Sequence, residues 1–273
     1  MNVLLLKEVF TRATLQKLLQ GDSSVIDGYF HMLINREGYA PPLLQQCQLL
    51  YQLQEQYDSS IKYFENAFLI DQLGHYRTLD FSLTGVHVAV YNQGHGYGIV
   101  LCPSADGLDT VDQRVHEAFT WFPQVKIVFN KVHEHFLLQR YRGSAVGLVR
   151  YDNKEWLTLQ ATSLYYDELD STLLFYRLTS SEQLYVLYTF YPDLSLMLRK
   201  KSIEDLLSYF NKIPMECLVP VIQNCLYDRV AFEPYRRLLH VVPDGFKRLC
   251  YQGDWTREEE KKLMTLFRGK DGD

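Results

Sequence analysis

A histidine, a cysteine and a glutamine occupy positions from which their side chains could act together. His87 lies within the apolar run 85–91, Cys102 ends a second apolar run, and Gln139 follows in a polar segment. A hairpin histidine, a strand-end residue fifteen positions later and a glutamine-containing loop that runs into a helix form the skeleton of one kind of cysteine-nucleophile site. In such a site an imidazole takes up the proton of the thiol, and the resulting thiolate attacks the substrate.

Strands and helices must position these residues. Apolar runs on either side of the glycine-rich turn 94–98 predict a β-hairpin, with His87 on its first arm and Cys102 at the end of its second. Apolar residues at helical spacing predict a helix from about 111 to 121, and the run 125–130 predicts a further strand.

The rest of the chain adds mostly helices. Together the elements predict an α+β fold, with an N-terminal helical layer, a central antiparallel or mixed sheet and a helical C-terminal region. We expect helices at 7–20, 22–30 and 59–73, and further helices that begin at 41, at 202 and at 256, the last with a frayed end at 269–273. We expect a strand at 76–83 and a strand pair at 172–178 and 184–190. The segment 156–163 could be a strand or a helix. Pro214 and Pro220 are expected to interrupt the segment after the helix that Ser202 caps.

Three regions are expected along the chain. Residues 1–150 carry the helical layer and the site, 151–200 read as an inserted or variable segment, and 201–273 read as a helical region that completes the same domain.

Composition excludes several classes of protein. The chain has 273 residues, 47% of them hydrophobic and 14% aromatic, which predicts a packed globule. A net charge of −5 argues against nucleic-acid binding. Five widely spaced cysteines with no CxxC pair predict neither a disulfide framework nor a zinc site, so a reducing compartment is the simplest reading. No run is apolar enough for a membrane span, and the apolar start is too short for a cleavable signal peptide, so we expect a soluble protein.

Several blocks, in their order and spacing, resemble the YopJ family of bacterial effector acetyltransferases. The blocks are Val-Ile-Asp-Gly-Tyr-Phe-His at 25–31 with Pro-Leu-Leu at 42–44, Gly-Val-His-Val-Ala-Val at 85–90, Leu-Cys-Pro-Ser-Ala at 101–105, Gln-Arg at 139–140 with Ala145, and Glu-Pro-Tyr at 233–235 with the basic residues that follow. The similarity covers roughly residues 15 to 150 and 230 to 252.

The resemblance implies a cysteine-protease-like fold and a role for each site position. It makes His87 the base, and it puts Cys102 where the family has the glutamate that orients the histidine. It puts Ala145 where the family has the nucleophilic cysteine. An alanine cannot attack, and without the carboxylate nothing raises the pKa of the histidine, so the resemblance implies the fold more strongly than the activity.

The preferred hypothesis is therefore a catalytically impaired member of that family. Such a pseudoenzyme would bind a host protein or an active effector. It would be made in the bacterial cytoplasm and injected into a host cell by a specialised secretion system. Acetyl-CoA and inositol hexakisphosphate are the cofactors that the resemblance implies.

Other readings stay open. Ser144 could be a displaced nucleophile, and Asp106 or Asp109 could replace the orienting acid, which would leave a working acetyltransferase or hydrolase. Ala145 could instead be an introduced change, but Cys102 argues against this, because a single inactivating change would leave the orienting acid in place. Alternatively, His87 is a satisfied core histidine and the chain is an unrelated α+β interaction module.

A basic group near the C-terminus is the candidate anion site. Clustered arginine and lysine suit a polyphosphate, although a solvated face explains the same pattern. The residues are Arg236, Arg237, His240, Lys247 and Arg248. His133 and His135 could share a cleft if they alternated on a strand, but no third ligand accompanies them, so no metal site is expected.

Overall fold

The computed structural model describes residues 6–34, 41–57, 66, 78–80, 86–92, 95–102, 108–152, 155–229, 238–253 and 255–268. The chain divides into two compact units. The helical unit comprises Met1–Leu73 and Phe232–Asp273, and the sheet unit comprises Gly74–Ala231. The boundaries between the two units lie after Leu73 and after Ala231, whereas the sequence predicted boundaries near 150 and 200.

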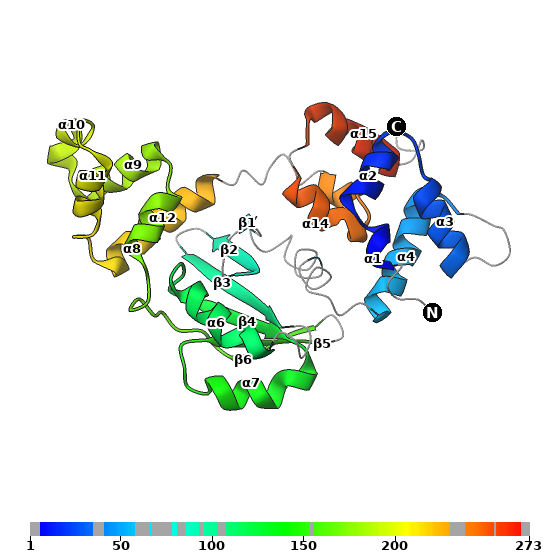
Figure 1. The fold of residues 1–273 in the computed structure, drawn as a ribbon, viewed down its shortest axis with the longest axis horizontal. Helices are drawn as coiled ribbons and strands as arrows, with labels where there is room; N and C mark the ends of the chain where they lie inside the picture. The colour runs from blue at the N-terminus through cyan, green and yellow to red at the C-terminus, as the bar shows by residue number, and fades with distance from the viewer. Residues whose placement is uncertain are drawn as a thin grey trace. The chain divides into compact units, whose positions relative to one another are not determined.

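A mixed six-stranded sheet organises the described part of the sheet unit (Figure 1). Its strands follow chain order: β1 (Thr78–Asp80), β2 (Val88–Asn92), β3 (His95–Cys102), β4 (Val125–Phe129), β5 (Gly147–Asp152) and β6 (Glu155–Gln160). The first three strands are antiparallel, β3, β4 and β5 run parallel, and β6 is antiparallel to β5. This arrangement confirms the α+β class, the mixed sheet and the hairpin of β2 and β3.

Helices connect the parallel strands and build the core. Helix α6 (Leu108–Phe119) joins β3 to β4, and the 3-10 helix η3 (Lys131–His133) with α7 (Glu134–Tyr141) joins β4 to β5. The chain then forms α8 (Ser171–Arg177), α9 (Ser180–Phe190), η4 (Pro192–Leu194), α10 (Ser195–Leu198), α11 (Ile203–Phe210) and α12 (Met215–Arg229). One face of the sheet shares a continuous apolar core with α6, α8, α9, α11 and α12. Strand β6 and α8–α10 belong to this unit, so 151–200 contributes both sheet and core.

The predicted strand pair at 172–190 is wrong, because α8 and α9 occupy this stretch. Asp170 accepts hydrogen bonds from the first backbone N–H groups of α8. Thr179 and Glu182 form a reciprocal capping box that starts α9. The apolar and aromatic residues suit either structure, and the caps together with core packing decide for helices.

The predicted break at Pro220 is also wrong, since α12 runs through it. A proline inside a helix removes one backbone hydrogen bond and crowds the preceding turn. The neighbouring Leu218 and Ile222 are fully buried in the core of the sheet unit. Their burial outweighs the local penalty.

The helical unit packs around a second apolar core. Its described helices include α1 (Leu6–Val9), α2 (Arg12–Leu19), α3 (Ser24–Leu33), α4 (Leu43–Tyr57), α14 (Asp244–Gln252) and α15 (Arg257–Arg268). One helix was predicted at 7–20, but Thr11 accepts a hydrogen bond from the backbone of Thr14 and starts a new helix there. Gly21 ends α2 with a φ of 83°. The helix predicted at 59–73, apart from residue 66, and the fraying at 269–273 lie outside the described residues.

Candidate functional site

His87 stands immediately before β2 and extends the ladder between β2 and β3. Its backbone N–H donates to the carbonyl of Ile99, over 2.9 Å. Its Nδ1 accepts a hydrogen bond from the backbone N–H of Leu101, also over 2.9 Å. The imidazole thus occupies the position that a backbone carbonyl would take if β2 began earlier.

This hydrogen bond sets the protonation of the ring. Because Nδ1 is an acceptor, the proton of the neutral imidazole is on Nε2. His87 is only 8% exposed, and Nε2 is buried without a hydrogen-bond partner. Burial, and secondarily the nearby positive charge of Arg114, lowers the pKa of His87 to about 4. The ring is therefore neutral at pH 7, and its one lone pair is already in use.

Cys102, at the end of β3, cannot orient a histidine as a carboxylate would. It is fully buried in the core of the sheet unit. Burial raises the pKa of its thiol to about 11, so the group is uncharged at neutral pH. His87 accordingly has no negative charge from this position to stabilise an imidazolium.

Gln139, Ser144 and Ala145 do not form the expected loop and helix. Gln139 is exposed on α7, and the chain continues from Ala145 into β5, so the predicted helix after the loop is a strand. The Ser144 hydroxyl donates to the carbonyl of Tyr141, over 2.8 Å, and accepts from the backbone of Val146, over 3.3 Å. These bonds give Ser144 a turn-forming role.

The sheet register separates His87 from Ala145. Residues Val88, Ile99, Lys126 and Gly147 form one row across β2 to β5. Three steps between strands place the ends of this row about 14 Å apart. His87 and Ala145 each precede the strand that contributes to this row. Because β2 and β5 run in opposite directions, the two residues lie beyond the row on opposite sides of it. The structure therefore does not bring the predicted base and nucleophile positions together.

The basic group is only partly described. Arg236 and Arg237 lie outside the described residues. His240 is exposed, and the Nζ of Lys247 pairs with the carboxylate of Asp244 over 2.6 Å. The backbone N–H of Arg248 donates to Asn66 Oδ1 over 3.0 Å. The polyphosphate pocket stays a prediction.

The histidines 133 and 135 do not alternate on a strand. His133 ends η3 and His135 is on α7. Within the ranges that the structure describes, no three or more histidine, cysteine or acidic side chains gather as metal ligands would.

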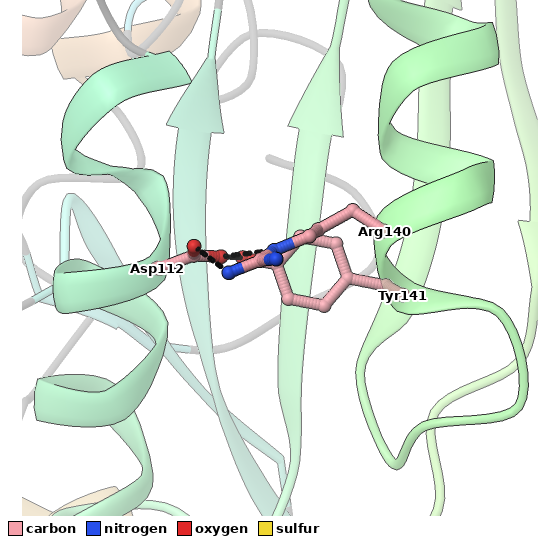
Figure 2. Close-up of polar contacts among 3 residues, drawn as sticks. All are labelled: Asp112, Arg140 and Tyr141. Carbon is pink, nitrogen blue, oxygen red and sulfur yellow. Dashed lines mark hydrogen bonds and ion pairs between the residues drawn. The ribbon is translucent and has the colours of Figure 1, made fainter.

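A polar cluster that the sequence did not predict joins α6 to α7 (Figure 2). The carboxylate of Asp112 accepts from Arg140 Nη2 over 2.5 Å and from Nε over 3.3 Å. It also accepts from the hydroxyl of Tyr141, over 2.5 Å. The hydrogen bond from Arg140, followed by that from Tyr141, lowers the pKa of Asp112. The partners are 28 and 29 residues apart, so no local pattern could reveal them.

Comparisons with known proteins give no relative. No family model, no curated protein and no solved structure matches the chain. Of the helices in the described ranges, none is both long and apolar enough to cross a membrane.

Proposed function

We propose that this chain acts by binding another protein and performs no acyl transfer at His87. The observation that supports this most is the hydrogen bond from Leu101 to Nδ1 of His87. A general base needs a lone pair within reach of the proton that it abstracts. Here the only lone pair of the neutral ring is buried against β3. The thiol at 102 and the methyl group at 145 supply neither an orienting charge nor a nucleophile.

The finer proposal is a degenerate YopJ-like effector with a cysteine-protease-like ancestry. It is made in bacterial cytoplasm, injected into a host cell, and binds a host protein or an active effector. The order and spacing of the sequence blocks support this descent. The strand β5 after Ala145, where the pattern requires a helix, argues against it and favours a second candidate, an interaction module of separate origin.

Transfer and cofactor binding are tested together. Calorimetry measures the binding of acetyl-CoA and of inositol hexakisphosphate to the purified chain, and a radiolabelled acetyl donor reports autoacetylation. We expect no label transfer, with or without inositol hexakisphosphate. His87→Asn and Ser144→Ala are the matched variants. Transfer that disappears in His87→Asn at an unchanged melting temperature contradicts the proposal.

Partner binding has its own test. The chain is produced together with an active YopJ-type acetyltransferase from the same genome, and light scattering after size-exclusion chromatography measures the mass of each species. A stable complex supports the regulator form of the proposal. Two separate monomers rule out that form and leave the host protein as the partner to test.

A further inference from the structure

Helices α2 and α15 of the helical unit border a cavity of about 550 Å³. The residues that line it belong to these two helices and to the turn at Gln20 and Gly21 that ends α2. Gln20 and Thr265 are exposed, so the cavity opens to solvent. Its volume lies within the range of about 300–1,000 Å³ that is typical of small-molecule sites.

The inner wall of the cavity is apolar. Leu18, Leu19 and Leu266 line it. Leu18 is buried in the apolar core of the helical unit, and Leu19 and Leu266 are half-buried against the same core. This wall can receive an aliphatic chain, because methylene groups gain free energy when they leave water for an apolar surface.

The charged side chains around the cavity leave one positive charge without a partner. Glu258, Lys261 and Lys262 line the cavity from α15. The carboxylate of Glu258 pairs with Nζ of Lys262 over 3.0 Å, so these two charges compensate each other. Lys261 is exposed and takes part in none of the ion pairs of the described residues. An anion at this opening is attracted by Lys261, whereas a cation is repelled.

We propose that this cavity binds a small molecule with one aliphatic chain and one anionic head group. The chain lies against the three leucines, and the head group pairs with Lys261. The apolar wall favours such a molecule over a simple ion, and the charge favours it over an aliphatic cation. The site is independent of the proposed partner binding.

Octanoate and octyl sulfate are the main probes, and acetate and octyltrimethylammonium test the chain and the charge. Calorimetry on the intact protein, at constant ionic strength and below micelle-forming concentrations, gives each dissociation constant. We expect an octyl anion to bind at least about tenfold more tightly than acetate or octyltrimethylammonium. The tighter of the two octyl anions identifies the head group. Absence of binding by both octyl anions, or equally tight binding of the octyl cation, overturns the proposal.

A pair of lysine variants tests the head-group contact. Lys261→Gln removes the positive charge at the cavity. Lys200→Gln is the matched control, because Lys200 is exposed in the sheet unit and its loss changes the net charge equally. We expect Lys261→Gln to weaken binding of the tighter octyl anion about threefold, and Lys200→Gln to leave it nearly unchanged. Equal effects in the two variants overturn the proposal.

The place of the aliphatic chain is tested separately. Thr265 lines the cavity from an exposed position of α15, so Thr265→Phe adds a ring there without altering the core. We expect this variant to keep its melting temperature and to weaken binding about tenfold or more. Nuclear magnetic resonance of ¹³C-labelled leucine methyl groups should show the signals of Leu19 and Leu266 moving on saturation of the parent chain. Binding that leaves both signals in place overturns the proposal.

Discussion

Two polar sites in the sheet unit differ in whether a polar atom is left without a hydrogen-bond partner. The Asp112 carboxylate is about half exposed and receives hydrogen bonds from both Arg140 and Tyr141 (Figure 2). His87 is buried, uses one ring nitrogen for the sheet and leaves the other without an acceptor. The first site needs nothing more, whereas the second lacks an acceptor.

The Asp112 cluster makes more hydrogen bonds than the His87 side chain, yet we expect it to contribute less to stability. An exposed ion pair competes with water on both sides and adds little to stability, even with good geometry. A buried polar group has lost its hydrogen bonds to water. Its hydrogen bonds within the protein therefore decide its protonation state and the free-energy cost of its burial. The two sites should therefore respond very differently to pH and to substitution.

Acidification should give the largest difference between the sites. His87 is neutral when folded, with a pKa of about 4, and has its ordinary value of 6.5 when unfolded. Below pH 6.5 His87 binds a proton in the unfolded state but not in the folded state, so the free energy of unfolding falls as the pH drops. Between pH 7 and pH 4 we expect a loss of about 3 kcal/mol in the free energy of unfolding, measured by urea titration.

The Asp112 site should be silent in the same window. Its pKa is lowered from 3.8, so its contribution is present above that value and disappears only at lower pH. Asp112→Asn should keep the pH dependence between 7 and 4, while His87→Asn should lose the part that comes from His87. The part that remains includes His133, whose pKa is also lowered by burial. An identical slope in both variants would falsify the assignment of this slope to His87.

Substitution of His87 should have the next largest effect. His87→Ala removes the acceptor for Leu101 N–H and opens a cavity, which we expect to destabilise the protein by about 2 kcal/mol or more at pH 7. The matched variant is His87→Asn, whose side-chain oxygen can accept the same hydrogen bond. Equal loss in both variants, measured by urea titration, would mean that the hydrogen bond contributes nothing.

Gln160 should show an intermediate effect, since it holds the turn between α7 and β5. Its Nε2 donates to the carbonyls of Tyr141, Ser144 and Val146, over 3.0, 3.2 and 2.7 Å. Its Oε1 accepts from the backbone of Gly143, over 3.3 Å. Gln160→Ala should cost about 1 kcal/mol, seen as a lower melting temperature. Gln160→Glu keeps only the acceptor, and full stability in that variant would show that the donated bonds are unimportant.

The Asp112 pair should show the smallest effect. Asp112→Asn and Arg140→Gln should each change the free energy of unfolding by less than about 1 kcal/mol, and a double-mutant cycle should give a coupling of the same size. The coupling should shrink further in high salt. A larger coupling that persists in high salt would show that the pair is shielded from water and would remove the contrast with His87.

The sequence predicted elements whose signals are local. The apolar runs around 94–98 were enough for the hairpin of β2 and β3. Ser202 and Thr256 were correctly placed at helix starts, because each caps the N–H three residues later. At 172–190 the caps Asp170 and Thr179 were equally local, but the apolar and aromatic composition masked them.

The site could be predicted only as a list of residues. The tautomer of His87 depends on Leu101, and its neutrality depends on burial and on Arg114 from another element. The separation of His87 from Ala145 depends on the order and direction of four strands. Such relations come from tertiary packing, which residue spacing along one chain does not contain.

The helical unit is assembled from both ends of the chain, with the whole sheet unit between them. During synthesis, α2, α3 and α4 leave the ribosome on the order of ten seconds before α14 and α15. In that interval, the N-terminal helices can pack only against one another, and the part of their core that Phe246 and Phe267 later supply is missing. The sheet unit is continuous and can complete its fold first. Truncation after α12 would therefore leave the core of the helical unit incomplete.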